Sequence, residues 1–266
     1  MNANLRYEWR RISTVRATWI LGACVVVVAA LIAEGAAWGL SRAAAAAAPA
    51  NDGSGLTADP SGGLHLSLGV FAVGMAGGLV TMILLAVISA QAFGQDYRHG
   101  TIRLTLTLFP RRVPVFFART IVVAAVTVVI YLLALAVAVL VALPNGSVVD
   151  VAFDGAFFLI VLRSVLYMLG FLLIVFALTV LTRILALGVI IPIVLALIVE
   201  PLAVTLLHAY ASAVPAFLTH LDSVLPFTSG KNFLGDVDLV RNGLVYVAWV
   251  VVLMAAALWS FRKRDA

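Results

Sequence analysis

Charged residues are scarce in this chain of 266 residues: they make up 11% of the sequence, against 64% hydrophobic residues. A soluble globular domain has roughly 25% charged and 45–50% apolar residues, so the composition excludes that class. The mean hydropathy of +1.16 agrees with this exclusion. The sequence therefore predicts an integral membrane protein in contact with lipid, and its net charge of +5 gives no reason to expect nucleic acid as a partner.

Signatures of catalysis and cofactor binding are also missing. The single cysteine, Cys24, excludes a disulfide within the chain. The Gly230-Lys231 pair lacks both the earlier glycine and the following Ser or Thr of a phosphate-binding loop. The histidines are scattered rather than set at metal-ligand spacing, and no hydroxyl in an apolar run has a His or Lys placed to activate it. We therefore expect this chain to bind no cofactor or metal and to catalyse no reaction itself.

The chain instead contains six long apolar runs. Each is long enough to cross a hydrocarbon core of about 30 Å as an α-helix. A closed β-barrel would need alternating segments of roughly ten residues, and these runs are unbroken. The sequence therefore predicts an all-α membrane protein with six transmembrane helices in a single domain over residues 1–266. The runs are about Ala17–Leu40, Leu66–Phe93, Thr120–Leu143, Ala156–Leu181, Ile184–Leu207 and Leu244–Phe261.

The distribution of Lys and Arg predicts the orientation, because cytoplasmic loops of membrane proteins are enriched in both. If the N-terminus is cytoplasmic, the opposite side holds only Arg42, Lys231 and Arg241, and Arg163 falls inside a span. We therefore expect a multi-pass protein of the cytoplasmic membrane with both termini in the cytoplasm. The basic residues on the cytoplasmic side would be Arg6, Arg10, Arg11, Arg16, Arg98, Arg103, Arg111, Arg112, Arg119, Arg183, Arg262, Lys263 and Arg264.

Residues 1–16 have the pattern of an amphipathic helix. Apolar side chains such as Trp9 and Ile12 recur at helical spacing, and arginines occupy the other faces. Such a helix suits the cytoplasmic membrane surface, where anionic lipids attract arginine. Alternatively, these arginines only anchor the first span. The apolar run that follows is longer than the roughly 7–15 residues of a signal peptide's core, which argues against cleavage.

Residues 94–112 form a basic, patterned segment between the second and third runs. Alternating apolar and polar residues at 101–108 would favour a strand, but a lone strand there would have no partner. Gly100 permits a bend, Thr101 can cap a short helix, and Pro110 can end it. So short a helix needs a partner surface to be stable. A basic loop on anionic lipid is the alternative; it explains the arginines but not this order of Gly, Thr and Pro.

The stretch "QDYRHGTIRLTLTLFPRRVPVFFART" resembles the cytoplasmic signature of the type-2 ABC transporter permeases, which are six-helix exporter subunits. Those permeases show an acidic residue, Arg, Gly-Thr, a Leu-rich segment, Pro and basic residues; Asp96 stands here where they more often have Glu. The resemblance implies a short cytoplasmic coupling helix that docks on a separate ATPase subunit. The coupling residues would be Asp96, Tyr97, Arg98, Gly100, Thr101, Ile102, Arg103, Leu104, Pro110 and Arg111.

The same resemblance implies partners and a function. Two ATPase copies, which bind the ATP and Mg, would serve a homo- or heterodimer of permeases, and the N-terminal helix would join the cytoplasmic contact. The permease would export a hydrophobic or amphipathic substrate such as a drug, lipid or peptide. An energy-independent transporter or channel is the main alternative, and a non-transporting assembly or immunity protein is a third.

Three charged residues, Glu34, Arg163 and Glu200, fall inside apolar runs toward the outer side. An unpaired charge at the centre of a membrane costs about 2.5–3.5 kcal/mol on insertion scales, so we expect Arg163 to pair with Glu34 or Glu200, within the chain or across a dimer. A substrate contact or outer gate is the alternative interpretation.

Residues 208–243 are too apolar for a free outer loop, so the sequence predicts an ordered lid on the outer surface. Pro215 fits the first turn of a helix there, and Pro226 its end. Two further patterns concern the spans: Gly74 and Gly78 predict a close helix contact, and prolines interrupt the fifth run. The lid residues would be Phe217, Leu221, Val224 and Phe227.

Overall fold

The computed structural model describes residues 2–47, 66–101, 107, 112–145, 149–150, 153, 155–210, 224–235 and 237–263. Helices dominate these residues, and six are long and apolar enough to cross a membrane. The prediction of a multi-pass helical membrane protein is confirmed at this level. The six spans are Arg16–Gly39, Leu79–His99, Arg112–Ala142, Gly155–Thr182, Leu185–Ala209 and Leu239–Lys263.

The helices follow one another with few other elements between them. Two strands of two residues each, β1 and β2, pair in parallel with Leu66 opposite Val149. In order, the elements are α1 (Asn2–Thr14), α2 (Arg16–Ala47), β1 (Leu66–Ser67), α3 (Leu68–Gly77), α4 (Leu79–His99), α6 (Arg112–Ala142), η2 (Leu143–Asn145), β2 (Val149–Asp150), α7 (Gly155–Thr182), α8 (Leu185–Val194), η3 (Leu195–Val199), α9 (Glu200–Ala209), α11 (Pro226–Leu234) and α12 (Leu239–Lys263).

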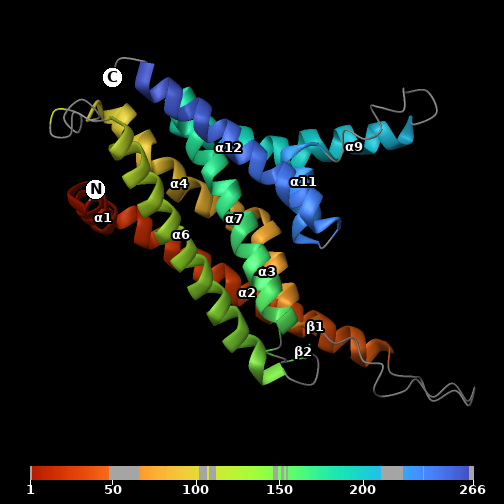
Figure 1. Cartoon of the computed structure of the whole chain (residues 1–266). Helices are drawn as coiled ribbons and strands as arrows, with labels where there is room; N and C mark the ends of the chain where they lie inside the picture. The colour runs from red at the N-terminus through yellow and green to blue at the C-terminus, as the bar shows by residue number, and fades with distance from the viewer. Residues whose placement is uncertain are drawn as a thin grey trace, which may run out of the picture.

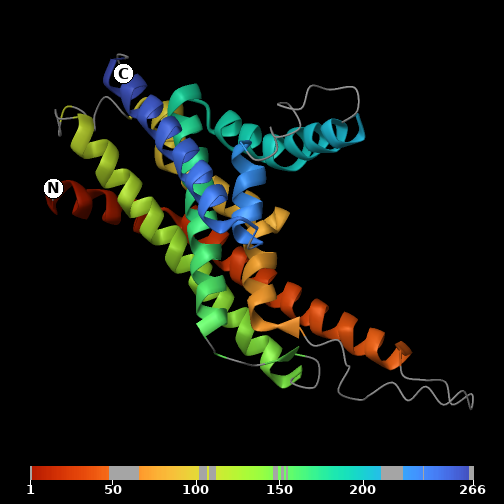
Figure 2. The same ribbon diagram turned by 45° about the vertical axis from the view of Figure 1, so that its right-hand side comes forward.

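Helix α7 lies at the centre of the bundle and packs against α3, α4, α8, α11 and α12, while α2 packs on α6 and α4. Its side chains Tyr167, Phe171 and Val175 are fully buried in the main hydrophobic core. Both termini lie at one end of the bundle (Figure 1), where α1 contacts α6 and α2. The α9 helix leaves the bundle near the top of both ribbon views (Figures 1 and 2).

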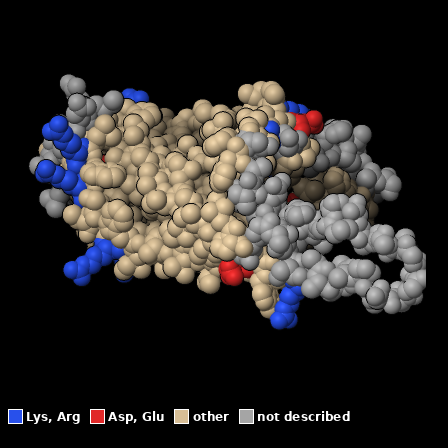
Figure 3. All heavy atoms as spheres, turned by 90° about the horizontal axis from the view of Figure 1, so that it is seen from below, with Lys and Arg blue, Asp and Glu red and all other residues tan. Residues whose placement is uncertain are grey.

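The surface is consistent with a membrane-embedded body. In Figure 3 the Lys and Arg side chains gather at the left, which is the end that carries both termini in Figure 1. The broad tan surface beside them shows few charged side chains. Because lipid tails cannot solvate charge, an uncharged band of this kind is what a membrane requires of the helices that cross it.

The second apolar run is two helices rather than one, because the chain breaks at Gly78. This residue has φ −71° and ψ 128°, and a Cβ built on it would lie 2.7 Å from the Gly74 carbonyl oxygen. Cβ atoms at Gly74 and Gly77 would meet nothing within 4 Å. Within this chain the glycines therefore mark a helix break, and the close helix contact predicted for them is not found.

Close helix contacts depend on other glycines. A Cβ on Gly170 of α7 would lie 2.5 Å from the Tyr246 ring of α12, and one on Gly188 of α8 would clash with Thr179 of α7. These positions let α8 and α12 approach α7 closely.

The fifth span bends through a widened turn. Residues Leu195–Val199 form the π-helix η3 between α8, which contains Pro192, and α9, which begins at Glu200 with Pro201 in its first turn. The prolines therefore interrupt the regular α-helix, as predicted, without ending it.

We expect Gly170→Ala to lower the melting temperature in detergent, because the added Cβ overlaps the buried Tyr246 ring. Gly35→Ala is the matched control: it lies within α2, where a Cβ would meet nothing within 4 Å. Thermal unfolding of the two purified variants checks the prediction. Equal melting temperatures for both variants would contradict the packing described here.

Candidate functional site

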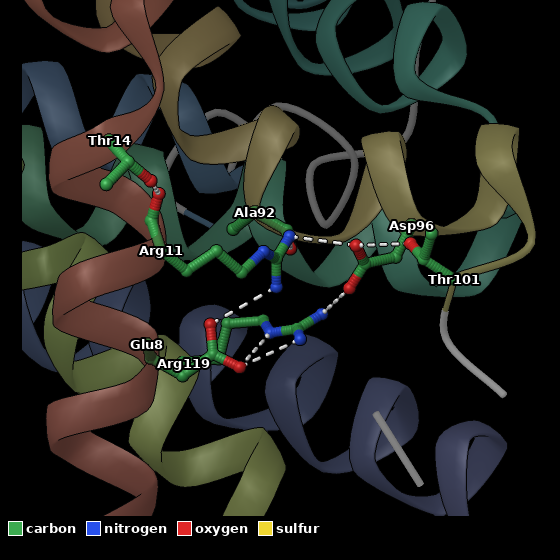
Figure 4. Close-up of polar contacts among 7 residues, drawn as sticks. All are labelled: Glu8, Arg11, Thr14, Ala92, Asp96, Thr101 and Arg119. Atoms are coloured by element: carbon green, nitrogen blue, oxygen red, sulfur yellow. Dashed lines mark hydrogen bonds and ion pairs between the residues drawn. The ribbon is translucent and has the colours of Figure 1, made fainter. Parts of the chain in front are cut away.

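Two acidic and two basic side chains from three helices form a closed ring of ion pairs (Figure 4). Arg119 of α6 places Nη1 2.7 Å from Asp96 Oδ2 of α4 and Nη2 2.8 Å from Glu8 Oε1 of α1. Arg11 of α1 completes the ring, with Nη2 3.0 Å from Asp96 Oδ1 and Nη1 3.2 Å from Glu8 Oε2. Each carboxylate thus contacts both guanidinium groups, and the ring is neutral as a whole.

Three of the four side chains in the ring are almost closed to water, and the fourth, Arg11, is 20% exposed. Glu8 and Arg119 are each 1% exposed, and Asp96 is 5% exposed. Charges buried this deeply must be paired and hydrogen-bonded. Arg119 meets that need with a further bond from Nε to Glu8 Oε1 at 3.1 Å and by stacking 4.2 Å from the centroid of the Phe93 ring. Burial lowers the pKa of Arg11, as does the nearby charge of Arg119, while Asp96 and Glu8 raise it; the guanidinium stays charged at neutral pH.

The ring also fixes where the chain leaves α4. This helix ends at Gly100, whose φ of 66° turns the backbone out of the helix. The next residue, Thr101, donates its hydroxyl hydrogen to Asp96 Oδ1 at 2.9 Å, and Arg11 Nη2 donates to the Ala92 carbonyl at 3.0 Å. The start of the predicted coupling segment is therefore hydrogen-bonded to the ring.

On the other side of the stretch 102–111, Arg112 is the first residue of α6. Its Nη1 donates to the carbonyls of Phe261 and Arg262 at 3.3 and 3.4 Å, in the last turn of α12, where carbonyls lack partners within the helix. The two ends of the stretch 102–111 are thus attached to α4 and α12.

An aromatic cluster lies next to the ring and joins four helices. The ring centroids of Phe93 and Phe176 lie 5.2 Å apart, those of Phe93 and Phe261 5.3 Å, and those of Phe116 and Phe176 5.5 Å. All four side chains are buried. The cluster keeps water from one side of the ring, which strengthens the ion pairs.

Of the ten predicted coupling residues, the structure describes five, Asp96, Tyr97, Arg98, Gly100 and Thr101. The carboxylate of Asp96 is held inside the ring rather than offered to a partner, because it pairs with the buried Arg119 and the partly buried Arg11, whereas Arg98 is exposed. Tyr97 stacks 6.0 Å from Phe93, and Arg183 lies over its ring. Ile102, Arg103, Leu104, Pro110 and Arg111 lie outside the described residues.

Sequence reasoning missed the partnership of Glu8 with Arg119. A signal was present, since Glu8 is the only acidic residue before Glu34 and stands in a helix with many arginines. A lone acidic residue there suggests a specific partner, but nothing in the local sequence identifies Arg119, which is 111 residues away.

A second buried carboxylate holds α11 against the fifth span. Glu200 accepts hydrogen bonds from the backbone N–H of Phe227 at 3.2 Å and of Thr228 at 2.6 Å, and from the Thr228 hydroxyl at 2.9 Å. One turn later, Lys231 Nζ donates to the Ala196 carbonyl of the π-helix at 2.9 Å. A helix N-terminus attracts negative charge, so this buried carboxylate is well satisfied.

The carboxylate of Glu200 is therefore satisfied by hydrogen bonds without an ion pair to Arg163. Among the ion pairs of the described residues, none joins Arg163 to Glu34 or Glu200, so the predicted pairing does not occur within this chain. The partners of Glu200 are instead two backbone N–H groups and one hydroxyl of α11. Arg163 is half-buried on α7, and Glu34 is exposed on α2.

Of the predicted lid, residues 208–210, 224–235 and 237–243 are described. Phe217 and Leu221 lie outside the described residues; Val224 is 51% exposed and Phe227 is buried. Pro226 is the first residue of α11. The helix that the sequence predicts to stop at Pro226 lies mostly outside the described residues. The fixed φ and missing N–H of proline suit a first helical turn equally well.

No protein-family model matches the chain, and no curated protein sequence matches it. Among the described residues, no group of three or more His, Cys, Asp or Glu side chains could hold a metal ion. Every charge in the ring is directed at another member of the ring. What this arrangement can do is mechanical: it makes α1, the end of α4 and the start of α6 move together.

We expect Arg119→Gln to destabilise the protein by about 3–5 kcal/mol, because it leaves two buried carboxylates with one arginine between them. Thermal unfolding in detergent measures the loss, and Arg10→Gln, at an exposed position on α1, is the control. Adding Glu8→Gln should restore part of the stability, since Arg11 and Asp96 then remain as a neutral pair. If the stability lost in the double variant equals the sum of the losses in Arg119→Gln and Glu8→Gln alone, the two residues are not coupled.

We expect Glu200→Ala to release α11. In a Cys24→Ala background, a cysteine at the buried position Ser229 should react several-fold faster with a thiol reagent once the helix loses its cap. The control is Glu34→Ala with the same reporter, because Glu34 is exposed. An unchanged labelling rate would show that Glu200 does not hold α11 in place.

Proposed function

We propose that this chain is the membrane-spanning subunit of an ATP-driven exporter. It works as a pair with a second permease copy and two copies of a separate ATPase subunit, which bind and hydrolyse the ATP. Its substrate is hydrophobic or amphipathic, such as a drug, lipid or peptide. The observation that carries the proposal is the buried ring, because it ties the N-terminal helix to the base of the stretch that resembles a coupling helix.

Force from an ATPase subunit must reach the spans through a small contact. A flexible attachment would absorb the motion, whereas the two residues that flank 102–111 are both fixed: Thr101 is hydrogen-bonded to the ring and Arg112 to α12. A push on this stretch is therefore passed to α4, α6 and α12. Such rigidity serves coupling and has no evident use in a loop that only binds lipid.

The proposed contact surface is basic. Arg98 is exposed at the end of α4, and Arg103 and Arg111 follow in the sequence. These residues suit a groove with acidic side chains on the ATPase, where opposite charge fixes the docking orientation. In this arrangement the end that carries both termini faces the cytoplasm, and the exposed arginines of α1 lie at the inner membrane surface.

The test is co-purification with a Walker A ATPase encoded by a neighbouring gene. We expect Arg98→Ala combined with Arg103→Ala to lower ATPase recovery while the melting temperature stays unchanged, because Arg98 is exposed. Asp96→Ala should lower both, since this carboxylate belongs to the ring. Arg42→Ala, on the opposite side of the membrane, is the control.

Full ATPase recovery and parental export in the double variant would refute docking through this segment. Substrate transport by the reconstituted chain without any ATPase would favour an energy-independent transporter or channel instead.

A further inference from the structure

A groove of about 500 Å³ runs between α7 and α12, which lie side by side in Figures 1 and 2. It lies within the two membrane spans, and Phe233 of α11 contributes to its wall. Its volume falls in the range of roughly 300–1,000 Å³ that small-molecule sites occupy. Gly170 and Gly243 help to form the groove, since neither adds a side chain to it.

The groove offers no polar group to a ligand. Tyr246 is the only lining residue with a polar side-chain atom, and its hydroxyl is already used, donating to the Tyr167 carbonyl at 2.8 Å. Small-molecule sites normally combine an apolar wall with a few polar groups that orient the ligand. A wall without any such group favours a ligand that has no polar groups to bind, such as a hydrocarbon chain.

The length and direction of the groove match one membrane leaflet. Along α12 it extends from Leu239 to Val250, which is about 17 Å at 1.5 Å per residue. One leaflet is half of a hydrocarbon core of about 30 Å. The groove also opens to the outside of the bundle, because the lining residues Leu244 and Val247 are 66% and 56% exposed. On a membrane span, that side faces lipid.

We propose that this groove holds one acyl chain of a membrane phospholipid as a resident ligand, drawn from the leaflet at the end where α12 begins. The acyl chain lies against half-buried side chains such as Leu173 and Val250. Lipid that moves freely around the bundle would contact these side chains less often than the exposed surface. The bound chain also contacts Phe233 and so supports α11 from the lipid side. This site does not depend on whether the protein is an exporter.

The experiment uses the full chain in phosphatidylcholine vesicles that contain a small fraction of phosphatidylcholine with a photoactivatable diazirine in its acyl chain. After irradiation, labelled residues are mapped by mass spectrometry. We expect several-fold more label at Leu173 and Val250 than at Val251 and Val252, although the latter two are each 59% exposed. Label that instead follows exposure, strongest at Val251 and Val252, overturns the proposal.

A variant that fills the groove gives a second test. Val247→Trp should cut the label at Leu173 by more than half, whereas Val252→Trp, a matched change at similar exposure outside the groove, should leave it unchanged. Unchanged label in Val247→Trp refutes the site; should that variant fail to fold, the labelling pattern of the unmodified protein decides.

Disulfide-linked dimers of a Val247→Cys, Cys24→Ala variant would show a second copy in the groove and would also overturn the proposal.

Discussion

The charge of Arg119 imposes the main constraint on this end of the molecule. A guanidinium cannot be neutralised by losing its proton, so at 1% exposure it must be balanced by carboxylates. One comes from α1 and one from α4, and their combined charge in turn requires Arg11. Three segments far apart in the sequence therefore meet in one neutral ring, in which α1 adds the pair Glu8–Arg11 to the pair Asp96–Arg119 of α4 and α6.

The ring explains how α1 is attached to the bundle. Its exposed Trp9 and arginines face outward, while Ile12 packs on the aromatic cluster. The inward side chains Glu8 and Arg11 add ion pairs to α6 and α4. A polar attachment of this kind specifies position and angle more narrowly than an apolar one, since each guanidinium must face particular oxygens.

The spans were predictable because composition and run length alone decide whether a helix can cross a membrane. The polar contacts were not. Arg119 and Glu8 are 111 residues apart, and Glu200 and Thr228 are 28 apart across a stretch with no periodic signal connecting them. Gly78 illustrates a different limit: small residues at this spacing fit both a close helix contact and a helix break, and only the surrounding structure distinguishes them. The coupling segment itself stays a prediction, since most of it lies outside the described residues.

The π-helix Leu195–Val199 determines which way Glu200 points. Each residue of an α-helix turns the chain by about 100°, so deleting one residue from this widened turn would rotate all of α9 by that angle relative to α8. Glu200 would then turn away from α11, and the Ala196 carbonyl would return to ordinary helical pairing and be lost to Lys231. The number of residues in the fifth span is therefore constrained, because the loss of a single one would point Glu200 in another direction. We expect deletions in this span to be tolerated far less than substitutions of its outward-facing side chains.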